Sequence, residues 1–246
     1  MKQYTWQIIL GISFILASAS LYTVQIVVFH DVRSTFFYLL QDIAFIPIQV
    51  LLVTLILNQM LNMREKIAML NKMNMVIGTF FSEAGAGLLK LFSGFDQNMD
   101  ALRKDLLVTG QWSDRQFSEA TGIVSSYDCK IDHAKTDFVT LKYFLTTRRD
   151  FLLRLLENPN LLEHETFTEL LWAVFHLTEE LTARENLTEL SPLDASHIAG
   201  DIKRAYVLLI MEWLAYMKHL KSEYPYLFSL AIRMNPFDPH ASAIVR

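Results

Sequence analysis

Residues 4–29 read YTWQIILGISFILASASLYTVQIVVF and residues 43–63 read IAFIPIQVLLVTLILNQMLNM, and neither stretch contains a charged side chain. Each provides the ~20 apolar residues that an α-helix needs to cross the ~30 Å hydrocarbon core of a bilayer. A short segment carrying Asp31, Arg33 and Asp42 separates them. The sequence therefore predicts a two-helix transmembrane hairpin over residues 1–61, with spans at about 5–29 and 39–61.

A secretory signal peptide is the alternative to the first span. Lys2, the apolar run and Ala17-Ser18-Ala19 match the charged start, the apolar centre and the small-residue cleavage site of such a signal. The apolar run continues for ten residues beyond that site, to Phe29. We therefore expect an anchor that is not cleaved.

Basic residues near the spans predict their orientation. Lys2 flanks the first span and Arg64 and Lys66 follow the second, whereas Arg33 in the connecting loop is offset by Asp31. Because cytoplasmic flanks carry the excess of Lys and Arg, both termini are expected in the cytosol. The prediction is a multi-pass protein of the inner (cytoplasmic) membrane, with the lipid bilayer as its first partner.

Helical periodicity dominates residues 62–246, and we find no alternating strand pattern there. The expected fold class is therefore all-α, with a cytosolic bundle of about five helices after the hairpin. A juxtamembrane helix is expected first, over 62–93. Further helices are expected from about 115, over 137–157, over 164–185 and over 193–223. Ser191-Pro192 can cap the last of these, and its apolar stretch 207–214 predicts a central, buried helix.

Charge and cysteine content exclude several function classes. The chain has 22 Lys and Arg against 26 Asp and Glu, a net charge of −4. This balance gives no support for nucleic-acid binding, which needs a basic face. Cys129 is the single cysteine, so an intrachain disulfide cannot form. Its surroundings show no catalytic-cysteine pattern.

A line of small residues follows the second span. Gly78, Ser82 and Ala86 are spaced four apart, so a second helix could approach this face closely. The alternative is that Gly85 and Gly87 simply weaken or end the helix. The segment Gly85–Lys90 has a glycine-rich look but lacks the spacing and the preceding strand of a phosphate loop.

Two expected helices share a spacing of acidic and imidazole side chains. Each has a Glu, a His seven residues later and a Glu four residues after that: Glu169, His176 and Glu180 in one, Glu212, His219 and Glu223 in the other. Each trio lies on one helical face. If the two faces met, they would resemble in type the ligand sets of di-iron bundles and could bind a divalent metal. An ion-paired helix contact and a solvated face are the alternatives, so no cofactor is predicted outright.

His133 with Asp128, Asp132 and Cys129 is a second group of potential metal ligands. Its spacing matches no structural zinc pattern. We therefore do not expect a metal there.

The second span has one distinctive face. Asp42, Gln49, Ile56 and Met60 follow one another at steps of seven, seven and four residues. A carboxylate at the outer end, an amide deeper in and apolar residues beyond would suit a cation pore with a hydrophobic constriction. The alternative places Asp42 at the aqueous interface and lets Gln49 hydrogen-bond the partner helix.

Residues 74–83, NMVIGTFFSE, and residues 235–239, NPFDP, resemble segments of uncharacterised bacterial membrane proteins with two predicted spans. The resemblance implies a membrane protein over most of the chain, and it implies no activity and no site.

Three function classes remain compatible with these patterns. We expect a membrane-anchored, non-enzymatic helical protein that forms a homo-oligomer and acts as a scaffold or sensor. The first alternative is a homo-oligomeric cation channel whose pore is lined by the second span. The weaker alternative is a metal-dependent enzyme that uses the two Glu/His faces.

Overall fold

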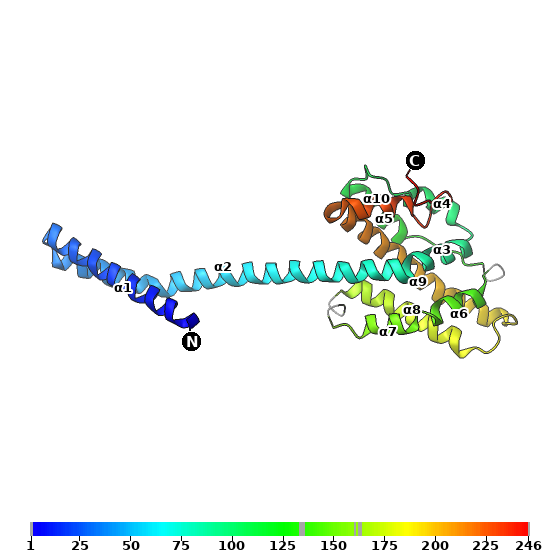
Figure 1. Cartoon of the computed structure of the whole chain (residues 1–246), viewed down its shortest axis with the longest axis horizontal. Helices are drawn as coiled ribbons and strands as arrows, with labels where there is room; N and C mark the ends of the chain where they lie inside the picture. The colour runs from blue at the N-terminus through cyan, green and yellow to red at the C-terminus, as the bar shows by residue number, and fades with distance from the viewer. Residues whose placement is uncertain (1, 133–135, 160, 162–163, 246) are drawn as a thin grey trace. The chain divides into compact units, whose positions relative to one another are not determined.

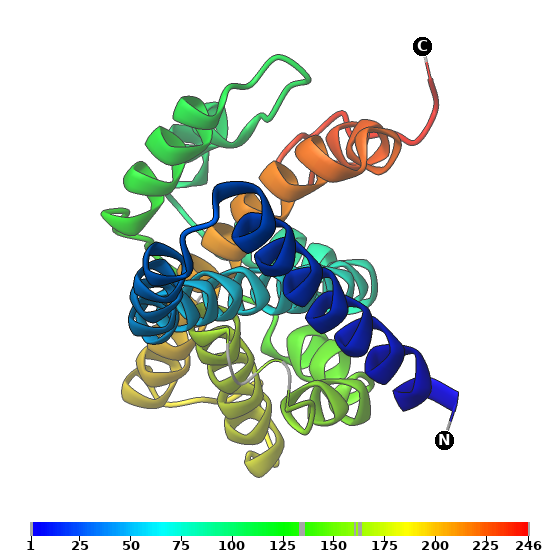
Figure 2. The same cartoon turned by 90° about the vertical axis from the view of Figure 1, so that its left-hand side faces the viewer.

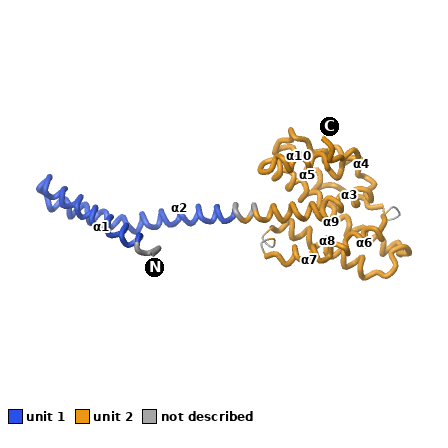
Figure 3. The backbone as a smooth tube through the Cα atoms, viewed as in Figure 1, with its two compact units in different colours: residues 1–66 blue, residues 67–246 orange. Residues whose placement is uncertain are grey.

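The computed structural model describes residues 2–132, 136–159, 161 and 164–245. The chain divides into two compact units, residues 1–66 and 67–246 (Figure 3). Over the described residues the regular structure is helical, apart from one isolated bridge between Asp96 and Ile131 (Figure 1). This confirms the predicted all-α fold class.

The first unit contains α1 (Lys2–Phe29) and the beginning of α2 (Val32–Phe80). His30, at a positive φ of 54°, makes the turn between them. Asp31 then caps α2, since its carboxylate accepts hydrogen bonds from the backbone N–H and the hydroxyl of Ser34. Further along, the Tyr22 hydroxyl donates to Asp42 Oδ2 at 3.3 Å and ties the two helices together.

Three helical stretches are long and apolar enough to cross a membrane, by length and composition: 8–29, 32–66 and 72–95. The first two lie in the first unit, and their most apolar windows have no buried residue. The third is 44% buried and belongs to the second unit. Its apolar side chains, including Ile77 and Phe80, form part of that unit's core, so a bilayer is not needed to cover them.

The second unit begins with the end of α2, a π-helical turn (Phe81–Gly85) and α3 (Ala86–Phe95). Aromatic packing fixes this turn from both sides. Phe80 meets Phe167 edge to face, with ring centroids 5.3 Å apart, and Phe81 stacks on Tyr216 at 5.1 Å. Figures 1 and 2 show this segment lying between α6–α8 on one side and α5 and α10 on the other.

The remaining helices are more numerous than the sequence predicted. They are α4 (Met99–Arg103), a 3₁₀ turn (Lys104–Leu106), α5 (Asp114–Ser125), α6 (Phe138–Thr146), α7 (Arg149–Leu156), α8 (Glu165–Ala183), α9 (Pro192–Glu223) and α10 (Pro225–Arg233). The prediction of one helix over 137–157 is wrong, because the chain breaks at Thr147 and Arg148. There the Thr147 hydroxyl bonds back to the Tyr143 carbonyl and Arg148 donates to the Glu83 carbonyl, which favours a helix end.

α9 is the central helix of the second unit, as its apolar stretch predicted. It packs against α3, α5, α8 and α10. Its start also agrees with the sequence, since Ser191 Oγ accepts from the Asp194 backbone N–H ahead of Pro192. Contacts at both ends show that α8 and α9 are antiparallel: Thr166 meets Glu212, and Glu180 meets His197.

Candidate metal centre

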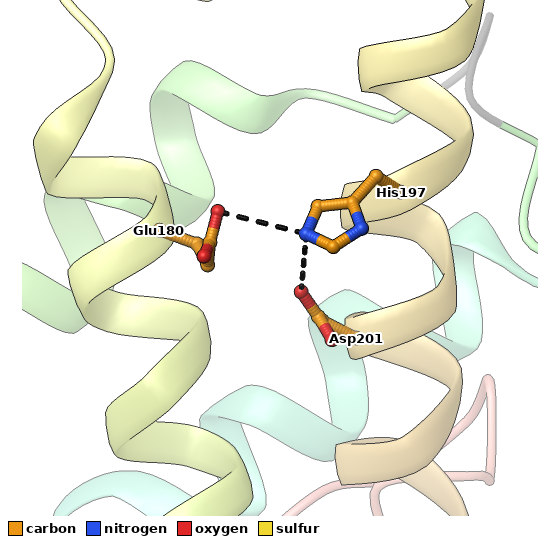
Figure 4. A group of neighbouring side chains, drawn as sticks. All are labelled: Glu180, His197 and Asp201. Carbon is orange, nitrogen blue, oxygen red and sulfur yellow. Dashed lines mark ion pairs between the residues drawn. The ribbon is translucent and has the colours of Figure 1, made fainter.

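Four polar side chains oppose one another where α8 ends and α9 begins. His176 and Glu180 are one turn apart on α8, and His197 and Asp201 are one turn apart on α9. Residues four apart share a helical face, so the antiparallel pairing sets His176 against Asp201 and Glu180 against His197. Figure 4 shows Glu180, His197 and Asp201 pointing toward one another. We refer to these four residues as the quartet.

The quartet brings its ligand atoms close without hydrogen bonds between them. Asp201 Oδ2 lies 3.6 Å from His176 Nε2 and 3.7 Å from His197 Nε2. Glu180 approaches the same two imidazole nitrogens at 3.8 and 3.7 Å. Ligands held at ~2.0–2.1 Å from a tetrahedral zinc ion are roughly 3.4 Å apart. The four imidazole-to-carboxylate distances are therefore a few tenths of an ångström longer than that spacing, and the ligand atoms that all lie within 4.8 Å of one another are those of Glu180, His197 and Asp201.

Asp201 is the member of the quartet whose hydrogen-bonding capacity is not satisfied. Its side chain is 6% exposed, and its buried Oδ2 has no hydrogen-bond partner among the residues that the structure describes. Only Oδ1 accepts a hydrogen bond, at 3.4 Å from Arg204. A buried carboxylate oxygen left this way is costly, and a cation shared with the two imidazoles would satisfy it. Two imidazoles and two carboxylates suit Zn²⁺, Fe²⁺ or Mn²⁺.

Arg184 holds the outer side of the quartet. It donates to Asp194 Oδ1 at 2.6 Å and to Glu180 Oε2 at 2.7 Å. These hydrogen bonds keep the pKa of both the Glu180 and the Asp194 carboxyl below its ordinary value. Glu180 is thereby held ionised and fixed in position, which is what an outer partner of a metal ligand does.

Only His176 and Glu180, of the six predicted ligand residues, come together at this site. Glu169 and Glu223 are exposed. Glu212 is buried and accepts a hydrogen bond from the Thr166 hydroxyl, and burial raises its pKa. His219 Nδ1 lies 3.2 Å from Asn74 Nδ2, and burial lowers its pKa. The predicted meeting of the two Glu/His lines is therefore corrected, because the antiparallel register of α8 and α9 pairs Glu180 with the first turns of α9.

Sequence reasoning missed His197 and Asp201. The signal was present, since His197 and Asp201 repeat the four-residue spacing of His176 and Glu180 at the facing end of the next helix. The predicted pattern, a Glu followed by a His seven residues later and a Glu four residues after that, does not include this His-Asp pair.

The second predicted ligand group has different surroundings. His133 lies outside the described residues. Cys129 is buried, and burial together with Asp96 raises the pKa of its thiol to about 12. Asp128 is paired with Lys203 at 2.6 Å. A thiol that stays protonated is a poor metal ligand, and the expectation of no metal at this group stays a prediction.

Two of the three small residues line a cavity. Gly78 and Ser82 belong to the wall of a space of about 760 Å³, together with Tyr216 and His219. A Cβ on Gly78 would come within 3.1 Å of the Tyr216 hydroxyl. Ala86 lines a different cavity. Gly78 therefore faces Tyr216 of a second helix, α9, and Ser82 lines the same cavity, whereas close helix packing along the whole small-residue line stays a prediction.

The predicted pore residues all lie in the first unit. Asp42, Gln49, Ile56 and Met60 are exposed there, and Asp42 accepts the hydrogen bond from Tyr22. Their role stays a prediction.

These features define a class: a helical protein with an apolar two-helix unit, a helical bundle and a candidate metal centre within the bundle. Residues 2–61 match the family model described as "MJ1433, N-terminal helical domain". Residues 69–233 match "Uncharacterized protein MJ1433, C-terminal helical domain". The chain belongs to this family of uncharacterised helical proteins.

One relative covers nearly the whole chain. "Uncharacterized protein MJ1433" of Methanocaldococcus jannaschii is 44% identical over 238 residues, which are 97% of this chain and 96% of the relative. The expected resemblance to an uncharacterised family is confirmed, but its bacterial origin is not supported, because this relative is archaeal. No solved structure matches the chain.

Proposed function

We propose that the protein is a membrane-anchored metal sensor or scaffold whose bundle binds one divalent transition-metal ion at the quartet of His176, Glu180, His197 and Asp201. The hairpin over residues 1–61 holds the chain in the inner membrane, and both termini lie in the cytosol. The observation that carries this proposal is the buried Asp201 Oδ2, which has no hydrogen-bond partner and faces two imidazole nitrogens.

Membrane anchoring is supported by the apolar surface of the first unit. The apolar windows of its two helices are fully exposed within the unit. Apolar surface left in water costs roughly 25 cal/mol per Å². A bilayer removes that cost, and contiguous apolar surfaces of this extent mark membrane or protein contacts.

A binding role is favoured over catalysis by the number of protein ligands. Catalytic zinc sites keep one position open for water or substrate, whereas structural sites are closed by four protein ligands. Glu180, His197 and Asp201 have ligand atoms within 4.8 Å of one another, and His176, 3.6 Å from Asp201, would be the fourth ligand that closes the site. A bound ion would join α8 to α9 across the connection 184–191, so metal occupancy would change the stability of that connection.

Metal titration of the full-length protein in a neutral detergent tests the proposal. After chelator treatment and dialysis, Zn²⁺ is titrated by calorimetry, and thermal unfolding is followed by circular dichroism. We expect one Zn²⁺ per chain and a higher unfolding midpoint. Mn²⁺ is the second probe, and Mg²⁺, which prefers all-oxygen sites, should bind more weakly.

The matched variants are neighbours on α8. Glu180→Gln should weaken Zn²⁺ binding at least tenfold, because it removes a ligand charge. Glu179→Gln removes the same charge from a side chain that instead pairs with Arg149, and it should leave binding unchanged. Absence of saturable Zn²⁺ binding, or equal losses in the two variants, would overturn the metal role.

A homo-oligomeric cation channel is the second candidate. It is favoured by the exposure of Asp42 and Gln49 on the first unit, where both remain accessible to further copies of the chain. Particle mass and symmetry in detergent provide the first test, and conductance of reconstituted protein with Asp42→Asn the second. A monomer or dimer, or the absence of conductance, contradicts the channel, and conductance whose selectivity Asp42→Asn leaves unaltered contradicts the pore-lining role of Asp42. A larger closed ring without conductance favours the scaffold.

A further inference from the structure

A second cavity of about 520 Å³ lies in the bundle, remote in sequence from the quartet. One wall comes from α3, with Gly87 and Lys90, and another from the tail segment 234–239. Arg103 of α4 lines it as well. The glycine-rich segment before Lys90 and the NPFDP segment therefore meet at one site, although they are about 150 residues apart in the chain.

The lining of this cavity is basic in an acidic chain. Lys90 and Arg103 contribute two positive charges, and Asp238 is the one acidic side chain among the lining residues. The Asp238 carboxylate accepts from the His240 backbone N–H at 2.8 Å, which occupies one of its oxygens. Within the described part of the chain, Lys90 makes no ion pair.

Arg103 has unused hydrogen-bonding capacity at the cavity. Its Nη1 donates to Asp100 at 2.6 Å, and the Asp100 side chain is 87% exposed. Its Nε is buried and has no hydrogen-bond partner. Because Nε is closed off from solvent, an anion in the cavity would be bound by the N–H groups of the guanidinium Nη atoms.

The cavity wall that the tail segment 234–239 forms is fixed in position. Asn235 is buried, and its side-chain amide donates to the Leu106 carbonyl at 2.9 Å while its oxygen accepts from the Phe237 backbone N–H at 3.0 Å. Phe237 in turn packs edge to face on Trp213 with ring centroids 5.0 Å apart. The cavity is therefore preformed, and Gly94, with open space around its α-carbon, leaves it unobstructed.

We propose that this cavity binds the phosphate group of a small phosphorylated molecule through Lys90 and Arg103. Arginine offers a planar set of N–H donors that matches phosphate oxygens, and lysine adds a compact positive charge. The cavity volume falls in the ~300–1,000 Å³ range of small-molecule sites and exceeds what a lone phosphate ion needs. This site shares no residue with the quartet, so it stands or falls independently of the metal site.

Thermal unfolding and calorimetry of the full-length protein in neutral detergent test the site. The probes are inorganic phosphate, adenosine monophosphate and dioctanoyl phosphatidic acid, each compared with sodium chloride at equal ionic strength. We expect a phosphate-bearing probe to bind saturably and raise the unfolding midpoint. Preference for the nucleotide identifies a soluble ligand, and preference for phosphatidic acid identifies a lipid headgroup. Either preference supports the phosphate site.

Charge-matched variants locate the binding. Lys90→Gln changes an exposed side chain and should lower the affinity for the tightest-binding probe at least tenfold without changing helix content. Arg103→Gln should lower that affinity by a similar factor. Lys104→Gln removes an equal charge from an exposed side chain outside the cavity and should retain binding. No shift beyond the salt control, or an equal loss in Lys104→Gln, would overturn the proposal.

Discussion

The two ends of the α8–α9 interface each contain a buried carboxylate, and the two carboxylates differ in their hydrogen bonding. At one end Glu212 is 5% exposed and accepts a hydrogen bond from the Thr166 hydroxyl, so the chain itself satisfies it. At the other end Asp201 is equally buried, but its Oδ2 has two imidazoles nearby and no hydrogen bond. The comparison teaches that a shared helical face and burial do not distinguish the two carboxylates, whereas the hydrogen-bond partner of each does.

The largest expected effect comes from replacing Asp201, the unsatisfied carboxylate, and it is a loss of stabilisation by Zn²⁺. A ligand at a thousand times its Kd stabilises the folded state by about 4 kcal/mol. We expect Zn²⁺ to give a stabilisation of that order in the starting protein and none in Asp201→Asn, measured by thermal unfolding with and without Zn²⁺. Glu212→Gln is the control at the other end and should keep the full Zn²⁺ effect. If Asp201→Asn is still stabilised by Zn²⁺, Asp201 is not a zinc ligand and the two ends of the α8–α9 interface do not differ in metal binding.

The next effect concerns Arg184, which supports the quartet end alone. Its partners have lowered pKa values, so the stabilisation is present above their ordinary pKa near 4 and is lost as the pH falls through the lowered folded values. Arg184→Gln should therefore lower the unfolding midpoint at pH 7, and only modestly, because Asp194 is partly exposed. Unfolding of the metal-free protein from pH 2 to pH 8 should show the two proteins converging in acid. A constant difference across that range contradicts the ion-pair explanation.

A smaller effect of opposite sign is expected at the satisfied end. Burial raises the pKa of Glu212, so the folded state holds its proton more tightly than the unfolded chain does. Stability therefore falls as the pH rises from the ordinary value of 4.5 through the raised folded value. Glu212→Gln keeps an acceptor for Thr166 and should be more stable than the starting protein at pH 7, because it removes the cost of burying a charge. Below pH 4 the gain should disappear, and a loss at pH 7 would show that the charge is needed.

The smallest effect is expected at Glu169, which is on α8 but belongs to neither end. Its side chain is exposed, and exposed substitutions usually change stability by less than about 0.5 kcal/mol. Glu169→Gln should leave Zn²⁺ affinity and the unfolding midpoint unchanged. A tenfold loss of Zn²⁺ affinity in this variant would mean that the ligands differ from the quartet.

Local sequence signals predicted the helices well where a cap or a long apolar face is present. Ser113 forms the full capping box at the start of α5, and Ser191 with Pro192 starts α9 within one residue of the expected position. The break after α6 was not predictable in the same way. It depends on Arg148 reaching the carbonyl of Glu83, a residue 65 positions away.

The candidate site was half predictable for a similar reason. Helical spacing alone placed His176 and Glu180 on one face of α8. Their partners depend on the register between α8 and α9, which is set by the length of the connection and by core packing around Leu177, Leu181 and Ile198. Sequence periodicity contains no information on that register, so the prediction chose Glu212 and His219 instead of His197 and Asp201.

The π-helical turn at Phe81–Gly85 has a consequence for how the length of this chain can vary. Phe80, Ala84, Leu88 and Phe92 are spaced four apart, and all are at most 2% exposed. In a plain α-helix each four-residue step rotates the face by about 40°, so this series would leave the core. The π turn has more residues per turn than an α-helix, so each residue in it rotates the chain by a smaller angle, and this cancels most of that rotation. Losing one residue inside the turn would restore α-helical winding and keep Leu88 facing inward, whereas losing one elsewhere in α2 would rotate every later side chain by about 100°. The turn is therefore a place where a homologue can be one residue shorter and still bury the same face.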